Sequence, residues 1–238
     1  MKKVSVVLSL VVVVVSLAFV YGCGSSSTDA AKTKAIALIE RVENGEVFLK
    51  RATQTDFSKA DPKTELFPGD VVRTSKDSEA LIRFRTGAVT RVLAESEFML
   101  KELKFAANEM GTVYTKLAKG IAYFYVPKGS TEAKKFEVET ERAIASIKGT
   151  TFKVSDDGNF TTLSVASGVV NLAAKSDGKS IDVEAFQEAK ADNKGLSKHT
   201  SGDIMAEGFL KKFNFLSDQY FSDLTLGEVG TKVLKGTR

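Results

Sequence analysis

The chain has 238 residues, of which 43% are hydrophobic and 27% are charged, with 16 Phe and 3 Pro. This composition supplies enough apolar side chains for a folded core, and it excludes a mostly disordered protein. The formal charge is +4 and the basic and acidic residues are interspersed, which excludes the electrostatic footprint of a nucleic-acid-binding protein. One cysteine and one histidine exclude an intrachain disulfide and a structural zinc site built from several such ligands.

The N-terminal residues have the pattern of an export signal. Lys2 and Lys3 precede an uncharged run, Val4–Tyr21, which is typical of a secretory signal peptide and is also long enough to remain as a membrane anchor. The run ends in Val20-Tyr21-Gly22-Cys23, which resembles the bacterial lipobox in a relaxed, spirochaetal-like form. We therefore predict a lipoprotein signal peptide over residues 1–22 and lipid attachment, including palmitate, at Cys23.

A short polar segment follows the predicted lipid. Gly24-Ser25-Ser26-Ser27-Thr28 is typical of a flexible tether, so we assign residues 23–34 to a linker. Two or three acyl chains on Cys23 would make a lasting anchor, whereas one chain holds only marginally. Gly24 at the position after the cysteine favours the outer membrane over the inner one. Loss of Lys2 and Lys3 with the signal peptide would lower the net charge from +4 to +2.

Residues 35–190 alternate between apolar and polar side chains. Phe136 and Val138 alternate with charged residues, and Ile82 and Phe84 alternate with arginines. Such a period of two places one face of a strand in a core and the other in water. The pattern predicts an all-β domain over residues 35–190.

Turn signals divide this domain into short strands. Asn44-Gly45 predicts a hairpin between strands over 35–42 and 46–51, while the polar stretch 52–65 is expected to be a long loop. Turn signals every eight to twelve residues are typical of a sandwich, a barrel or a solenoid. Glycines recur at intervals of nine or ten in two runs, which are Gly111, Gly120 and Gly129, then Gly149, Gly158, Gly168 and Gly178.

The period changes near the C-terminus, where residues 195–238 are predicted to form a helical tail. Apolar residues recur every three or four positions from Met205 to Leu224, and Thr200 with Asp203 resembles a capping box. We expect this tail to pack over the open end of the β domain, where it would cover a strand edge. Docking to a partner or lying on a membrane surface are the alternatives.

Several segments resemble the FecR domain family in their order and spacing. They are Leu66–Thr74, Ser78–Phe98, Lys119–Phe152 and Thr162–Val170. The resemblance implies a β-solenoid-like, or β-helical, domain. The residues that match the family's motif, and that we expect to shape the fold, are Gly69, Asp70, Thr74, Gly87, Gly120, Thr140, Gly149, Thr150, Phe152 and Gly168.

The resemblance also implies a role outside the cytoplasm. FecR proteins are best known from iron-uptake signalling, where they span the inner membrane, restrain a sigma factor and read a transporter from the periplasm. This chain has only three residues before its hydrophobic run and a short helical tail, so we do not expect the sigma-regulating role. The fold and a partner-facing character outside the cytoplasm are what we carry over.

The residues give little support to catalysis, and we expect no cofactor and no metal. His199 is the sole histidine and is expected to be solvated, and Asp156-Asp157-Gly158-Asn159 is expected to be a turn. The favoured hypothesis is a lipid-anchored, non-catalytic envelope lipoprotein that binds or organises a protein or polysaccharide partner. The alternative is an envelope carbohydrate-binding accessory or hydrolase with a dispersed site. The oligomeric state stays open.

Overall fold

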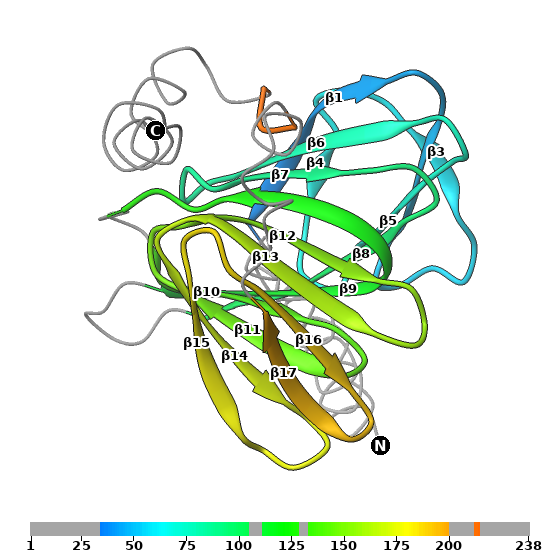
Figure 1. Cartoon of the computed structure of the whole chain (residues 1–238). Helices are drawn as coiled ribbons and strands as arrows, with labels where there is room; N and C mark the ends of the chain where they lie inside the picture. The colour runs from blue at the N-terminus through cyan, green and yellow to red at the C-terminus, as the bar shows by residue number, and fades with distance from the viewer. Residues whose placement is uncertain (1–33, 105–110, 129–132, 200–211, 215–238) are drawn as a thin grey trace, which may run out of the picture. The chain divides into compact units, whose positions relative to one another are not determined.

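The computed structural model describes residues 34–104, 111–128, 133–199 and 212–214 (Figure 1). The chain divides into Met1–Thr33 and Lys34–Arg238, and the described residues all belong to the second unit. In that described part, no helix is long and apolar enough to cross a membrane. The predicted signal peptide, Cys23 and the tether lie outside it.

The described part is built from β-strands in two layers, so the predicted all-β class is confirmed. Layer A consists of β1 (Ala37–Glu43), β4 (Glu65–Leu66), β6 (Glu79–Phe84), β7 (Val89–Val92), β12 (Thr151–Asp156), β13 (Thr161–Ser167), β16 (Glu188–Asp192) and β17 (Gly195–His199). Layer B consists of β2 (Val47–Lys50), β3 (Ser58–Ala60), β5 (Val71–Thr74), β8 (Glu97–Lys104), β10 (Ala133–Glu139), β11 (Ala143–Ile147), β14 (Val169–Ala174) and β15 (Ser180–Glu184). The strands thus continue past Lys190, where the sequence placed the end of the domain.

One long strand, β9 (Gly111–Tyr125), belongs to both layers. Its first half pairs with β8 and β10 in layer B, and its second half pairs with β7 and β12 in layer A. The strand changes layer at Gly120, which has φ +95°. A Cβ at Gly120 would lie 2.1 Å from the Ser96 Oγ atom, and that hydroxyl accepts a hydrogen bond from the Ile121 amide at 3.0 Å. A glycine is therefore required at the corner.

After β9 the chain runs as hairpins that alternate between the layers. Hairpins β10–β11 and β14–β15 lie in layer B, whereas β12–β13 and β16–β17 lie in layer A. We call the end of the strands where Lys34 begins the proximal end, and the opposite end the distal end. Hairpin turns lie at the distal end, and the crossings between layers after β11, β13 and β15 lie at the proximal end.

This arrangement explains the glycine spacing. Gly149 and Gly168 lie in proximal crossings, whereas Gly158 and Gly178 lie in distal turns. One interval of nine or ten residues is therefore one passage of the chain from one end of the layers to the other. The repeat marks passages between two antiparallel layers. Because the strand pairs are antiparallel apart from β9 with β10, a β-solenoid is not shown.

The Asn44-Gly45 hairpin prediction is wrong. Strand β1 pairs with β4 and β6 in layer A, while β2 pairs with β3 and β5 in layer B. Asn44 has φ +54° and Gly45 has φ +145°, so the pair forms a corner between layers. The corner is held because the Glu46 carbonyl accepts a hydrogen bond from the Ser75 amide at 3.0 Å, and the Glu46 amide donates to the Ser75 hydroxyl at 3.2 Å. The stretch predicted as a loop over 52–65 contains β3 and the start of β4.

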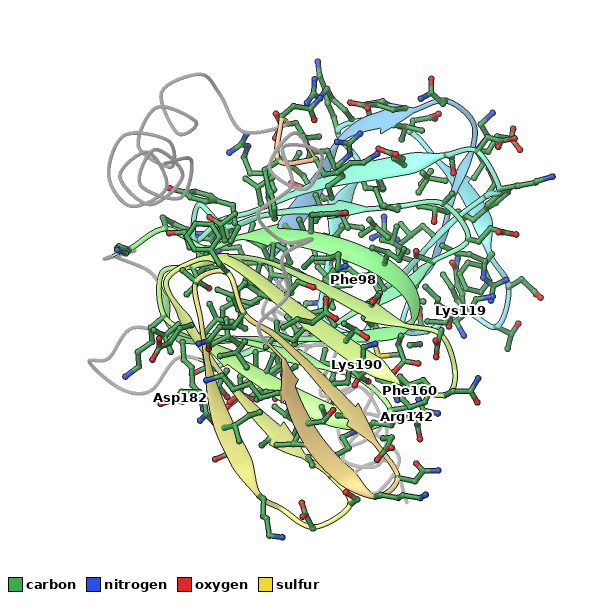
Figure 2. The ribbon with its side chains drawn as sticks, in the orientation of Figure 1. Phe98, Lys119, Arg142, Phe160, Asp182 and Lys190 are labelled. Atoms are coloured by element: carbon green, nitrogen blue, oxygen red, sulfur yellow. The ribbon has the colours of Figure 1, made fainter. Side chains whose placement is uncertain are left out.

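Aromatic side chains fill the space between the layers. Phe124 from β9 stacks on Phe152 from β12, with ring centroids 4.8 Å apart, and Phe84 from layer A meets Phe136 from layer B edge-on at 5.2 Å. Phe98 joins them from β8, as Figure 2 shows, and all five rings are at most 2% exposed. Full burial of such side chains is worth about 1.5–3 kcal/mol each, so this cluster holds the layers together.

The predicted helical tail lies mostly outside the described residues. Gly195–His199 form strand β17 instead of the start of a helix, and residues 212–214 form a turn. The remainder of the expected helix, 200–211 and 215–238, is outside the described part of the chain.

Gly149 and Gly158 provide a matched test of the proximal crossing. Both have positive φ, +68° and +89°, but a Cβ at Gly149 would lie 2.9 Å from the Lys128 Cα atom, whereas one at Gly158 would meet nothing within 4 Å. We expect Gly149→Ala to lower the free energy of unfolding by about 1–3 kcal/mol more than Gly158→Ala does. Urea unfolding measures the difference, and equal midpoints would contradict the packing argument.

Candidate functional site

The residues of the predicted motif lie at separate points of the fold and build turns. Asp70 is 1% exposed, and its carboxylate accepts hydrogen bonds from the Phe67 amide at 2.9 Å and from Arg51 at 2.7 Å. At Gly69 a Cβ would lie 2.6 Å from the Ala52 Cβ atom. These contacts fix the proximal turn between β4 and β5.

The other motif residues have similar surroundings. The Thr74 hydroxyl donates to the Leu93 carbonyl and accepts from the Ser96 amide at 3.0 Å, which ties β5 to the segment before β8. The Thr150 hydroxyl is buried without a hydrogen-bond partner among the described residues. Gly87 closes the β6–β7 turn, and Gly168 lies against the Thr150 side chain.

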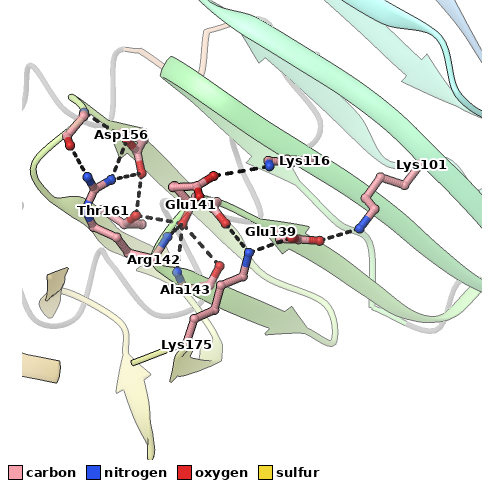
Figure 3. A network of polar contacts seen from close by, with 11 residues as sticks. Lys101, Lys116, Glu139, Glu141, Arg142, Ala143, Asp156, Thr161 and Lys175 are labelled. Atoms are coloured by element: carbon pink, nitrogen blue, oxygen red, sulfur yellow. Dashed lines mark hydrogen bonds and ion pairs between the residues drawn. The ribbon is translucent and has the colours of Figure 1, made fainter. Parts of the chain in front are cut away.

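A buried polar cluster lies at the distal end, around the turn predicted at residues 156–159 (Figure 3). The Asp156 side chain is 1% exposed and receives hydrogen bonds from Arg142 at 3.2 Å, from Thr161 at 2.7 Å and from the Gly158 amide at 3.0 Å. The Thr140 hydroxyl lies 2.7 Å from that of Thr161. Because three groups already hold this carboxylate, the cluster joins hairpin β10–β11 to hairpin β12–β13.

A second part of the network crosses the outer surface of layer B. The Glu139 carboxylate lies between Lys101 at 2.5 Å and Lys175 at 2.6 Å, as Figure 3 shows. Burial alone would raise the pKa of Glu139, but the hydrogen bonds and charges of the two lysines outweigh it and hold the pKa below its usual value. The described residues contain no group of three His, Cys, Asp or Glu side chains that could hold a metal ion. These contacts connect strands, and they offer no free acid or base.

The outer surface of layer A carries a different kind of feature, which we call the aromatic strip. It consists of Leu93, Tyr123, Tyr125 and Ala166, and it receives Phe213 from the C-terminal segment. The ring centroids of Phe213 and Tyr123 are 5.1 Å apart at 82°, and Phe213 is 1% exposed. The contact lies on the outer face of layer A, while the rest of the tail, which is expected to pack over the open end of the β domain, lies outside the described residues.

Arg91 holds the residues on both sides of Phe213. Its guanidinium donates to the Lys212 carbonyl at 3.2 Å and to the Asn214 side chain at 2.8 Å, while it also pairs with Glu79 at 2.5 Å. Burial raises the pKa of the Tyr123 hydroxyl. The strip therefore binds a short piece of polypeptide through one aromatic ring and two directed hydrogen bonds.

Sequence reasoning recognised part of this arrangement. The period of two expected for the strands is seen in β9, where Phe124 points into the core while Tyr123 and Tyr125 lie on the opposite face. Phe213 was assigned to the apolar stripe of a helix. Phe213 and Tyr123 are 90 positions apart in the sequence. The sequence indicated only that the surface rings of β9 and the apolar stripe of the tail would each be buried against another part of the protein.

Residues 70–171 match the family model described as FecR protein, a stretch that runs from the residue before β5 into β14.

Two crystal structures of a proposed anti-sigma factor from Parabacteroides distasonis ATCC 8503 are also similar to the chain. They share 17% and 18% identity with it, at TM-scores of 0.48 and 0.47. The alignments cover 59% of this chain and 63% or 64% of the other, so the match spans less than two thirds of those proteins. No curated protein matches the chain.

Phe213→Ala tests the contact with the aromatic strip. Phe213 is 1% exposed, so we expect the substitution to lower the free energy of unfolding by about 3 kcal/mol. Phe160→Ala is the matched control, because Phe160 is 45% exposed at the distal end, and its loss should cost less than about 0.5 kcal/mol. Urea denaturation compares the two. Equal midpoints would contradict the contact.

Glu139→Gln tests the charge network through its pH dependence. Because the folded-state pKa of Glu139 is lowered, its contribution to stability is present above the usual glutamate pKa and is lost as the pH falls through the folded-state value. We expect the free energy of unfolding of the wild type to exceed that of the variant by less than about 1 kcal/mol at neutral pH. This difference should vanish in acid. A constant difference across the pH range would contradict the account. Glu141→Gln is the control, since Glu141 is 69% exposed and 3.4 Å from Lys116.

Proposed function

We propose that the chain is a non-catalytic regulatory or signalling protein of the cell envelope, held to a membrane by a lipid on Cys23, whose FecR domain binds a protein partner. The observation that carries the proposal is the FecR family match over residues 70–171. Proteins of this family are membrane-associated and face the periplasm. The same placement follows here from the lipobox-like Val20-Tyr21-Gly22-Cys23 and the tether after it.

The aromatic strip supports a protein partner over a polysaccharide. It holds a piece of polypeptide by burying a phenylalanine ring and by hydrogen bonds from Arg91 to a backbone carbonyl and a side-chain amide. Aromatic and arginine side chains dominate the binding energy of protein–protein interfaces. We therefore place the partner contact at the strip and at the exposed residues that flank Phe213, Lys212 and Asn214.

Crosslinking in intact cells tests the partner. A photoreactive amino acid at Asn214 should give one protein adduct, while the same group at Lys194, an exposed residue of the distal β16–β17 turn, should not. Mass spectrometry identifies the adduct. Equal adducts at both positions, or none in any growth condition, would contradict the proposed surface, and a glycan adduct would favour the carbohydrate-binding alternative.

The anchor is tested in the same cells. Metabolic labelling with a fatty-acid analogue should mark the wild type and not Cys23→Ser, and the Asn214 adduct should decrease in that variant because the domain leaves its membrane. If the wild type is not labelled, the proposed lipid anchor is wrong. The proposed partner contact would still be tested by the crosslinked adduct at Asn214.

A further inference from the structure

The proximal end of the domain carries a set of unpaired positive charges. Six of the seven arginines in the described part pair with carboxylates, whereas Arg85, in the β6–β7 turn, takes part in no ion pair. Lys34, Lys128 and Lys148 are likewise exposed and unpaired within the described residues. We call these four residues the cationic end. A charge that lacks an internal partner is available for an external anion, and here four such charges lie at the same end of the layers.

The four side chains come from separate segments that the fold brings together. The Arg85 amide donates to the Ile36 carbonyl, two residues beyond Lys34, at 3.0 Å. A Cβ on Gly87 in the same turn would lie 3.6 Å from Pro127, and one on Gly149 would lie 2.9 Å from the Lys128 Cα atom. A continuous series of contacts therefore leads from Lys34 through Arg85 and Lys128 to Lys148.

An open concavity of about 510 Å³ lies within this end. Its charged lining residues are Lys34, Arg83, Arg85 and Glu65, and Leu38 and Phe84 are among its apolar ones. The Arg83 charge is shared with Glu40 at 2.6 Å, so the net charge around the concavity stays positive.

An exposed apolar residue stands beside the last of these cations. Val169 is 48% exposed and follows Gly168, which lies against the Lys148–Thr150 crossing. Glu184 is its cross-strand neighbour. Positive charges with an exposed aliphatic side chain among them are suited to a surface of anionic headgroups above an apolar layer.

We infer that the cationic end is the membrane-facing surface of the domain and binds the headgroups of anionic phospholipids. The inference rests on the proposed anchor at Cys23, because ten residues separate that cysteine from Lys34. A chain of this length spans at most roughly 40 Å when fully extended. The lipid would therefore keep the end with the unpaired charges close to the headgroups, and the distal hairpin turns would face away.

The arrangement supplies the second signal that an acyl anchor uses. Each basic residue near an anionic membrane surface strengthens binding about fivefold, and the attraction weakens with salt. Four such residues would hold the domain against the membrane and leave the aromatic strip on the flank of layer A accessible from the side.

Vesicle binding of the unacylated segment Gly24–Arg238 tests the inference separately from the anchor. The folded unit begins at Lys34 and its core consists of residues after it, so this segment retains the whole domain. We expect it to bind vesicles of phosphatidylcholine mixed with phosphatidylglycerol and to dissociate from them at high salt. It should not bind vesicles of phosphatidylcholine alone. Equal binding to both vesicle types, or to neither, would overturn the inference.

Neutralised variants locate the surface. Replacing Lys34, Arg85, Lys128 and Lys148 by Gln should weaken binding at least about 25-fold. The control with the same change in charge replaces four exposed lysines at distal turns and at the β9 corner, Lys76, Lys119, Lys179 and Lys194, and should retain binding within about threefold. Equal losses in both variants would overturn the assignment, and thermal unfolding at the wild-type temperature shows that each remains folded.

Two competition experiments identify the source of the anion. Inorganic phosphate should displace the protein from vesicles no better than chloride of equal ionic strength. Stronger displacement by phosphate would assign the cationic end to a soluble phosphate and overturn membrane binding. Single-stranded DNA is the second competitor. If it binds as tightly as the anionic vesicles, and if the Gln variant loses both kinds of binding equally, the cationic end is a general polyanion surface. That result would also overturn membrane binding.

Discussion

The two layers depend on one strand that changes direction. Strand β9 pairs on both sides in layer B before Gly120 and on both sides in layer A after it, so the hydrogen bonding of both layers passes through this corner. The Ser96 hydroxyl occupies the space that a Cβ at Gly120 would need, and the same hydroxyl satisfies the next amide. Phe124, four residues past the corner, then brings β9 into the aromatic core. Register, layer assignment and core packing are thereby coupled at a single residue.

Much of the fold class could be predicted because alternation of apolar and polar residues is a local property. Phe136, Val138, Leu163 and Val165 are all buried, as their spacing indicated. Which strands pair is not local, and this is where prediction was wrong. Asn44-Gly45 reports a backbone conformation with positive φ, which serves a corner as well as a hairpin. The regular glycines likewise indicated repeated passages of the chain without indicating that successive hairpins lie in opposite layers.

The site was harder to predict because its residues are distant in sequence. The family motif selected Asp70, Thr74 and Thr140, whose contacts stabilise turns and crossings. The contact of Phe213 with Tyr123 and the gathering of Lys34, Arg85, Lys128 and Lys148 at one end depend on the tertiary fold. Periodicity finds a buried face, whereas a surface assembled from several loops leaves no periodic trace.

The alternating hairpins have a consequence for the evolution of the domain. Each new hairpin after β9 is added beside the previous one in its own layer, and the last strand, β17, pairs with β16 alone among the described strands. An arrangement that grows outward in this way needs no closing strand, so a duplication or deletion of two successive hairpins would preserve the registers of everything nearer the chain's start. Homologous chains can therefore differ in length by whole pairs of hairpins while they share the same first half, and length variation among them should concentrate beyond β11.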